Sequence, residues 1–337
     1  MTDGLRVWLL SDGVPGHLNQ ARGLAYWMAK QLPLNVEEVS LRLRARTLSR
    51  RVLPMWIKRS MDPLRALEWA YNADYPEDAP DLIISAGGNT AFANVLLKRR
   101  FGVPNVFIGS GRRLDGNTFA AHLTLESTGG HSNIRMTLSP STVDAFQIVE
   151  AGRSWRKTVV PLDQQLFCMA CGGNGAGIRY GVKDWIRLGH WMSRMASELG
   201  IRWLVSTSRR TTPRGESALR EAIAPAALAY AVWWHQDPEP IFHQLLGAAD
   251  CNFVTHDSMS MINECISAER PLVVVEGGLG RPDPRYENVL KKFSELGFCR
   301  RMQVDAVFQG TPRLSEPASQ FHQALAREVL GALSIND

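Results

Sequence analysis

Short apolar runs alternate with helical patterns along the first half of the chain. The run Leu5–Leu10 predicts a strand, and apolar residues at helical spacing over Asn19–Lys30 predict the helix that follows. Alternation with few long loops favours a parallel sheet with helices on both faces. Further strands are expected at Val36–Leu41, Asp81–Ser85, Asn105–Ile108, His122–Leu125 and Arg135–Leu138, and further helices at Asp62–Tyr71 and between Thr90 and Arg100.

The same rhythm restarts after the polar segment Glu150–Asp163, which we interpret as the crossing between two domains. The predicted fold is α/β, with two Rossmann-like domains whose parallel sheets face a cleft, over 1–155 and 156–316, and a final helix over 317–337 that packs back on the first domain. Strands are expected at Leu166–Ala170, Trp203–Ser206, Leu228–Trp233, Cys251–Thr255 and Pro271–Val275, the last closing the sheet, and helices at Val182–Leu199, Glu216–Ala224, Pro240–Ala248, after Ser258, Tyr286–Leu296 and Pro317–Leu333.

The composition is that of a globular protein, with 45% hydrophobic and 21% charged residues. No membrane-spanning run and no signal peptide are found, so we expect a cytoplasmic protein. The net charge is +5, and the segment Arg42–Arg59 holds seven Lys or Arg residues and no acid, with apolar residues among them. This segment suits an anionic membrane surface and a peripheral position on its inner face. The alternative is a solvated helix face, and no module for nucleic acid is present.

Cysteine and histidine patterns do not predict a metal site. Cys168-x-x-Cys171 has the spacing of a metal or redox pair, but no second pair accompanies it. The five cysteines are therefore expected to be buried thiols. The eight histidines are scattered, so no metal ligands are assigned.

A first glycine-rich turn, Ser11–Gln20, follows the first strand and opens a helix. It matches neither the dinucleotide fingerprint nor a Walker A loop. His17 lies where the helix begins, and the helix N-terminus favours the neutral imidazole, a base for a hydroxyl proton. Asp12 is the competing base, and the plain alternative is a His17 that only hydrogen-bonds its loop.

A second glycine-rich turn, Gly172-Gly173-Asn174, follows a buried strand of the second half. Backbone amides at such a turn suit a phosphate. After the next strand come Ser208, Arg209, Arg210 and Thr211, whose two guanidinium groups can grip a diphosphate. The alternative is a surface arginine pair.

A third polar cluster follows the strand Cys251–Thr255. Asp257 or Ser258 can cap the next helix, and its first amides then suit a phosphate, with Ser260 beside them. Glu264 lies one to two turns into that helix and could accept both ribose hydroxyls. The alternative is that the cap residues only cap and Glu264 is solvated.

Together these motifs resemble the "elongated mitochondria" fission-factor family and its bacterial relatives, from Val7 to about Phe298. That family is similar to GT-B glycosyltransferases. The resemblance implies an N-terminal domain that faces the acceptor, to which we assign Gly13, Gly16, Asn19, Gln20, Gly87, Gly88 and Asn89. It implies that Gly172, Gly173, Asn174, Ser208, Arg209 and Glu264 hold a nucleotide sugar.

The resemblance further implies catalysis without a metal or other cofactor, with the nucleotide-diphosphate sugar as co-substrate. The leading hypothesis is transfer of a sugar from that donor to a membrane-associated or cell-envelope acceptor. One alternative is a non-catalytic scaffold that keeps the fold and recruits a partner at a membrane. Another is a nucleotide-sugar epimerase, but the only Tyr-x-x-x-Lys spacing, Tyr26 and Lys30, lies in the first helix.

Overall fold

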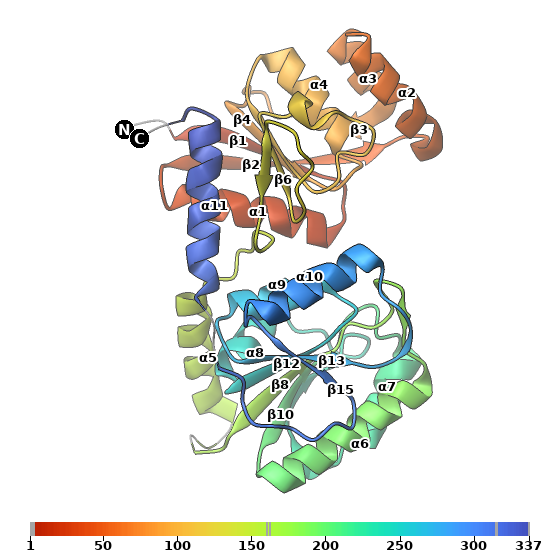
Figure 1. Ribbon diagram of the computed structural model, residues 1–337, viewed down its shortest axis with the longest axis vertical. Coiled ribbons are helices and arrows are strands. Elements are labelled where there is room, and N and C mark those ends of the chain that lie inside the picture. Colours follow the sequence, from red (N-terminus) through yellow and green to blue (C-terminus); the bar gives the residue numbers. More distant parts are fainter. Residues whose placement is uncertain (1–3, 160, 162, 314–315, 336–337) are drawn as a thin grey trace. The chain divides into compact units, whose positions relative to one another are not determined.

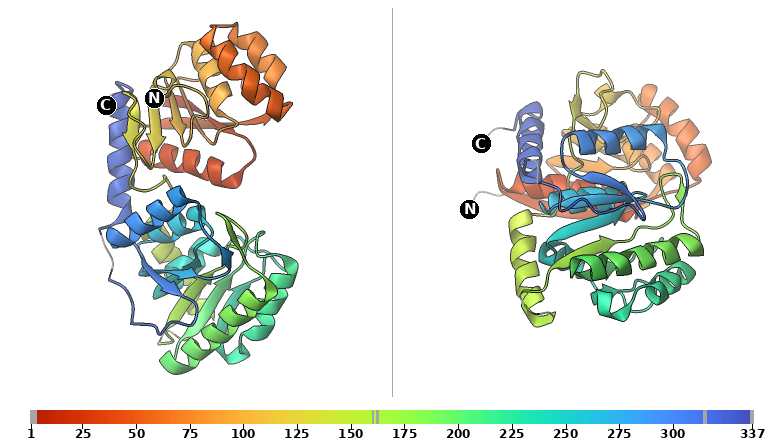
Figure 2. Two further views of the ribbon diagram at one scale, coloured as in Figure 1. Left: turned by 45° about the vertical axis from the view of Figure 1, so that its right-hand side comes forward. Right: turned by 60° about the horizontal axis from the view of Figure 1, so that its bottom comes forward.

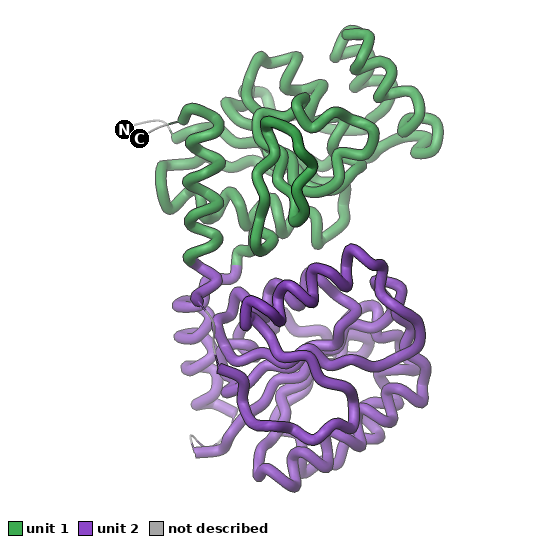
Figure 3. The backbone as a smooth tube through the Cα atoms, in the orientation of Figure 1, with its two compact units in different colours: residues 1–142, 320–337 green, residues 143–319 purple. Residues whose placement is uncertain are grey.

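The computed structural model describes residues 4–159, 161, 163–313 and 316–335, and it divides into two compact units (Figure 3). Unit 1 comprises residues 1–142 and 320–337, and unit 2 comprises residues 143–319. The large sheet of each unit is mostly or wholly parallel, as the alternating pattern predicts.

Unit 1 is built on a seven-stranded sheet in the order β3-β2-β1-β4-β5-β6-β7, in which only β3 is antiparallel to its neighbour. Its elements are β1 (Leu5–Ser11), α1 (Pro15–Ala29), β2 (Leu34–Leu43), α2 (Arg46–Lys58), α3 (Pro63–Ala70), β3 (Tyr71–Ala73), β4 (Leu82–Ala86), α4 (Ala91–Phe101), β5 (Asn105–Ile108), the 3-10 turn η1 (Gly116–Thr118), β6 (Ala121–Thr124), β7 (Asn133–Arg135) and, from the end of the chain, most of α11 (Ala318–Ala332).

Successive residues of each strand point to opposite sides of this sheet, and apolar side chains are buried on both sides. Val7 and Leu9 pack with α1, whereas Trp8 and Leu10 pack beneath α2, α3 and α4, and Figure 1 shows these helices on the two sides of the sheet. Helix α11 adds apolar side chains to the α1 cluster, including Leu325, Ala326, Val329 and Leu330.

Unit 2 contains a six-stranded parallel sheet in the order β11-β10-β8-β12-β13-β15, the Rossmann order. Helices lie on both sides of this sheet (Figure 2). Its elements are α5 (Ala145–Val159), β8 (Leu166–Ala170), β9 (Ile178–Arg179), α6 (Val182–Leu199), β10 (Arg202–Ser206), α7 (Pro213–Ala222), the 3-10 turn η2 (Pro225–Ala227), β11 (Leu228–Val232), α8 (Phe242–Ala248), β12 (Cys251–Thr255), α9 (Met259–Ser267), β13 (Leu272–Glu276), β14 (Leu279–Gly280), α10 (Pro284–Glu295) and β15 (Arg300–Gln303).

Two expectations about unit 2 are wrong. The segment Glu150–Asp163 is not a crossing loop, since residues 150–159 belong to α5; residues 160 and 162 lie outside the described residues. Gly152 of α5 packs directly on the backbone of Gly247 in α8, which explains why a polar-looking segment is a packed helix. Because α5 spans Ala145–Val159, the predicted division at 155/156 falls inside a helix, whereas the units divide at 142/143.

The second wrong expectation concerns the edge of the sheet, which is closed by β15 rather than by β13.

The cysteines are buried and free, as expected. Burial raises the pKa of the Cys168 and Cys171 thiols well above the ordinary value, so both remain protonated. They are inert core residues rather than a redox pair.

Candidate functional site

In unit 1 the chain runs outward in opposite directions from the neighbouring strands β1 and β4, which makes their carboxyl ends a topological switch point. The loops that follow these two strands meet there. The Asn89 side-chain amide, after β4, donates to Asp12 Oδ2, after β1, at 2.9 Å. The structure thus brings together residues that are 77 positions apart and that the sequence assigns to one functional region.

Asp12 and His17 form the centre of this cluster. His17 Nδ1 lies 3.1 Å from Asp12 Oδ1, and the Asp12 side chain is 3% exposed while that of His17 is 37% exposed. A carboxylate can only accept here, so the Nδ1 proton points to Asp12 and Nε2 carries the open lone pair. This arrangement suits a general base whose tautomer is fixed by the carboxylate.

Gly87 is required by the position of the His17 ring. Its φ is +84°, a conformation that side-chain-bearing residues rarely adopt, and a Cβ atom there would overlap His17 Nδ1 and Cε1. Gly88 is packed in a similar way, because its Cβ position is filled by the Arg112 side chain. The two glycines after β4 therefore make room for side chains.

Two residues that the sequence does not single out hold Asn89 in place. Arg50 of α2 donates from Nη2 to Asn89 Oδ1 at 2.7 Å, and the Tyr71 hydroxyl donates to the Asn89 carbonyl at 2.7 Å. Only their contacts in the fold reveal these roles, because Arg50 is one of many arginines in its segment.

The remaining residues assigned to the acceptor side lie in the turn after β1 and at the start of α1. Gly13 has a φ of +76°, and its N–H donates to Ser11 Oγ at 3.2 Å. Gly16, Asn19 and Gln20 belong to the first two turns of α1, where Asn19 is exposed.

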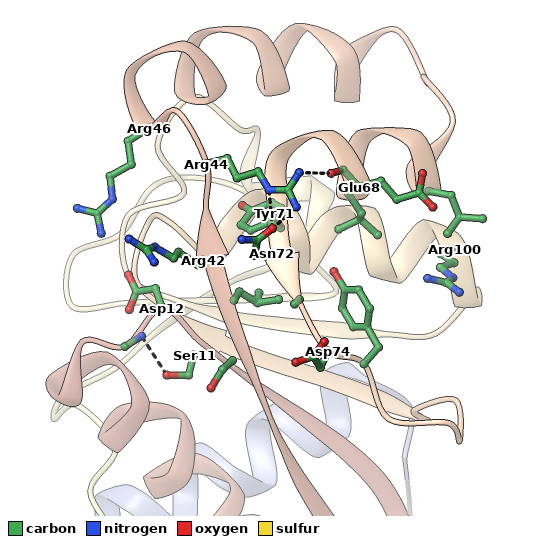
Figure 4. Close-up of a pocket in the computed structure, with 17 residues that line it drawn as sticks. Ser11, Asp12, Arg42, Arg44, Arg46, Glu68, Tyr71, Asn72, Asp74 and Arg100 are labelled. Carbon is green, nitrogen blue, oxygen red and sulfur yellow. Dashed lines mark hydrogen bonds between the residues drawn. The ribbon is translucent and has the colours of Figure 1, made fainter.

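A pocket of about 1060 Å³ opens beside Asp12 (Figure 4).

In unit 2 the switch point lies between β8 and β12, and the loops after these strands are in direct contact. The Gly172 amide donates to Thr255 Oγ1 at 2.7 Å. The Asn174 amide donates to the Arg210 carbonyl at 3.3 Å, and the Gly175 amide to the Ile178 carbonyl at 3.1 Å. These amides are used inside the unit, which differs from the expectation that the loop presents them to a phosphate.

The glycines of this loop are needed because Arg210 and Asp257 pack against them. A Cβ atom on Gly172 would overlap the Asp257 carboxylate, one on Gly173 would overlap the Arg210 carbonyl, and one on Gly175 would overlap the Arg210 guanidinium. Ser208 Oγ and Thr211 Oγ1 both donate to the Gly172 carbonyl, the latter at 3.0 Å, and so tie the arginine loop to the glycine loop.

Arg210 forms an ion pair with Asp257, with Nη2 3.4 Å from Oδ2. The carboxylate is fully buried, whereas the Arg210 side chain is 35% exposed. Burial raises the pKa of Asp257, against the opposite effect of the Thr255 hydroxyl and the Arg210 charge. This ion pair holds the Arg210 guanidinium near the start of α9, at the carboxyl ends of β8 and β12. Arg209, predicted to act with it, is exposed.

Helix α9 begins at this point with Ser258 as its N-cap residue. No side-chain cap hydrogen bond is formed, so the predicted capping role of Asp257 or Ser258 is wrong. Ser258 Oγ lies 3.3 Å from Ser260 Oγ, and the first turn holds no acid. The first helical amides, which have no intrahelical partner, are therefore left without a side-chain acceptor from the cap. Glu264, further along α9, pairs with His243 at 3.4 Å.

His256 is a buried group of this region that the sequence does not assign. Its Nδ1 lies 3.2 Å from the Tyr180 hydroxyl, and the Tyr286 hydroxyl donates to its carbonyl at 2.8 Å. Burial lowers the pKa of His256. Among the described residues, no group of three or more His, Cys, Asp or Glu side chains is placed to hold a metal ion, and no helix is long and apolar enough to span a bilayer.

The fold is shared with solved structures, although no curated protein matches the sequence. UDP-GlcNAc 2-epimerase from Methanocaldococcus jannaschii is similar at 11% identity with a TM-score of 0.54, over 97% of this chain and 99% of that one. The glycosyltransferase SnogD from Streptomyces nogalater is similar at 11% identity with a TM-score of 0.53, over 98% and 95%. MurG from Acinetobacter baumannii shows 14% identity and a TM-score of 0.47, over 98% and 94%.

Two Rossmann-like units, each with a polar cluster at its switch point, define a protein with the GT-B-like fold. The sequence narrows this class. The model of the family described as Mitochondrial fission ELM1 matches residues 15–333, and the chain belongs to that family. The family resemblance expected from the three motifs is thus confirmed.

Proposed function

We propose that the protein is a GT-B-type glycosyltransferase that moves a sugar from a nucleotide-diphosphate donor to a membrane-associated or cell-envelope acceptor. The observation that carries this proposal is the β8/β12 switch point, where the Arg210 guanidinium is fixed by the buried Asp257 beside the start of α9. A cation and uncapped helix amides at the carboxyl ends of parallel strands suit a diphosphate.

Arg210 and the first turn of α9 bear the negative charge of the leaving nucleotide diphosphate in this proposal. Glu264, on the same helix, accepts the ribose hydroxyls. A fixed guanidinium stabilises charge at a leaving group without reorganising, which is how preorganised groups lower a barrier. The proposal needs no metal ion for this step.

The Asp12–His17 pair is the general base. An acceptor hydroxyl oxygen attacks the anomeric carbon of the donor sugar, and the new C–O bond forms as the bond to the diphosphate oxygen breaks. The hydroxyl proton passes to His17 Nε2, while Nδ1 keeps its hydrogen bond to Asp12. All atoms of the donor end in the glycoside and the nucleotide diphosphate.

Helix α2 is the proposed contact with an anionic membrane surface. Leu48 and Met55, two turns apart, are 52% and 51% exposed, and Arg51 lies between them on the same side. An exposed apolar stripe bordered by cations suits the bilayer interface. The cytoplasmic, peripheral location belongs to the same proposal.

Nucleotide binding tests the proposal directly. UDP, GDP, ADP and CMP are titrated calorimetrically into the full chain, and at least one should bind saturably. Arg210→Gln should weaken that binding roughly ten- to hundred-fold, the range of a charge-assisted hydrogen bond. Arg153→Gln, which removes the same charge from the exposed face of α5, is the matched control.

The double variant Arg210→Gln/Asp257→Asn guards against misfolding, because the single change leaves a buried carboxylate without its cation. A folded double variant that binds nucleotide as the wild type does would overturn the assignment of the donor site. Release of an epimerised sugar nucleotide in the absence of acceptor would favour an epimerase instead.

A second candidate is a non-catalytic protein that recruits a partner at a membrane surface. One observation favours it: the glycine loop uses the amides of Gly172, Asn174 and Gly175 internally. Saturable vesicle binding together with no binding of any of the four nucleotides would support this candidate over the transferase.

A further inference from the structure

The large pocket of unit 1 has no part in the proposed donor site. It has a volume of about 1060 Å³ and opens at the carboxyl end of β2, where β3 and α3 form its other walls. Figure 4 shows its polar lining. Four of the lining residues are Arg42, Arg44, Arg46 and Arg100.

Three of these arginines come from one short stretch of chain. Arg42 is the last residue but one of β2, Arg44 follows the strand directly, and Arg46 is the first residue of α2. In Figure 4, Arg42 and Arg46 project toward the side of the pocket where Asp12 lies.

The guanidinium groups keep their charge available. Across the described part of the chain, no ion pair involves Arg42, Arg44, Arg46 or Arg100. Arg44 is held by neutral acceptors, with Nε donating to Asn72 Oδ1 at 2.6 Å and Nη1 to the Glu68 carbonyl at 3.2 Å. Its orientation is therefore fixed while its charge is not neutralised. Such a preorganised guanidinium favours an anion, and several together favour a phosphate group over a single carboxylate.

Carboxylates also line the pocket, namely Asp12, Glu68 and Asp74, and the Asn72 amide and Tyr75 ring lie with them. The carboxylates repel a bare polyanion, but a carboxylate accepts hydrogen bonds from hydroxyls. A ligand that satisfies both sets carries a phosphate together with hydroxyl groups. That chemistry is a sugar phosphate, and the pocket volume accommodates one with further groups attached.

We propose that this pocket binds a phosphorylated sugar, with Arg42, Arg44 and Arg46 on the phosphate and the hydroxyls toward Asp74. Its role as the acceptor rests on the proposed glycosyltransferase function, because Asp12 of the proposed base is among the residues that line the pocket. Binding itself does not depend on that function. The same phosphate chemistry is present in a soluble sugar phosphate and in a lipid-linked one.

Calorimetric titration of the full chain with glucose 6-phosphate tests the site. Saturable binding is expected, with each of Arg42→Gln and Arg44→Gln weakening it roughly ten- to hundred-fold. Arg135→Gln removes an equal charge from β7, the opposite edge strand of the same sheet, and should leave binding unchanged. Arg42 is exposed and makes no ion pair, so its variant is not expected to disturb folding.

A second arm distinguishes the source of the phosphate. Phosphatidylcholine vesicles carrying polyprenyl-phosphate-linked glucose are sedimented with the protein; the neutral carrier lipid avoids attraction through α2. Binding to these vesicles alone, lost in Arg44→Gln, identifies the lipid-linked form, and binding of glucose 6-phosphate identifies the soluble form.

Three results would overturn the proposal: no binding in either arm, binding that Arg42→Gln and Arg44→Gln leave unchanged, or glucose competing as well as its phosphate. The donor test through Arg210 is separate. If the protein binds nucleotide but no sugar phosphate, only the pocket proposal is overturned. If it binds sugar phosphate but no nucleotide, the proposed transferase function is refuted and the pocket assignment stands.

Discussion

Single residues of both switch points are fixed by what packs on them. The glycines after β4 and β8 leave space for the His17 ring, the Arg210 guanidinium and the Asp257 carboxylate. A motif of glycines next to a charged residue is usually interpreted as a phosphate loop. In this protein the glycines allow close packing that holds a charged or polar side chain in one position: His17 against Gly87, and Arg210 against Gly175.

Gly87→Ala should therefore affect the base directly. The new Cβ would displace the His17 ring, and the left-handed backbone adds its own cost of about 1 to 3 kcal/mol. We expect loss of the His17–Asp12 hydrogen bond, observed as changed chemical shifts of the His17 ring by NMR.

The matched control is Gly129→Ala. Gly129 has a similar φ of +73° and nothing within 4 Å of its Cβ position, so it carries the backbone cost without the clash. Unchanged chemical shifts of the His17 ring in Gly87→Ala, or an equal change in Gly129→Ala, would contradict this account.

At the scale of elements, α11 is held against α1 by a buried histidine. His322 stacks on Trp27 with ring centroids 5.5 Å apart, and burial lowers its pKa to about 4. The unfolded chain, with an ordinary histidine pKa near 6.5, binds the proton more readily. Protonation therefore favours the unfolded state.

The stabilising contribution of neutral His322 is present above pH 6.5 and is lost as the pH falls toward 4. We expect the free energy of unfolding of unit 1 to decrease by up to about 3 kcal/mol over this range. His322→Phe, which keeps the ring stack, should flatten that part of the pH profile. Denaturant unfolding at a series of pH values measures it; equal slopes in both proteins would refute the assignment.

Helix α2 gives the second prediction at this scale. Leu48→Ser/Met55→Ser removes the exposed apolar stripe and should weaken binding to phosphatidylglycerol vesicles in a sedimentation assay by about tenfold or more, since both side chains lose their burial in the interface. Val307→Ser is the control, because Val307 is 85% exposed and lies in unit 2. Equal losses in both would mean that the contact is not specific to α2.

The sequence predicts most elements but misses those that lack an apolar run. β8, α6 and β12 have the bounds expected from their periodicity. β15 is missed because it is a polar edge strand in which only Met302 is buried. The α5 helix is misinterpreted because its buried face is narrow, with Gly152 rather than a large apolar residue at the closest contact.

The candidate site is predictable where it follows strand ends and not where it depends on tertiary contacts. The switch-point rule predicts that Asp12 and Asn89 lie close together, since strand order decides which loops meet, and the two side chains are hydrogen-bonded. The inward use of the glycine-loop amides and the role of Arg50 depend on side-chain contacts that no local pattern specifies.

At the scale of the whole molecule, the donor proposal predicts a response confined to one unit. A ligand that binds only the folded state stabilises it in proportion to the logarithm of its concentration over Kd. In hydrogen exchange, a saturating nucleotide should slow the exchange of the 172–177 and 258–262 amides and leave β1 and β4 of unit 1 unaffected. Protection of unit 1 with no change in unit 2 would place the nucleotide elsewhere.

The return of α11 to unit 1 bears on how the protein is made. The fragment of residues 1–142 leaves the ribosome long before the helix that completes its α1-side core. Residues 143–319 are then synthesised in one stretch and can fold as they emerge. Unit 1 is thus the first to be synthesised and the last to be completed. Until α11 is synthesised, the apolar side chains that it would cover beside α1 are accessible to chaperones.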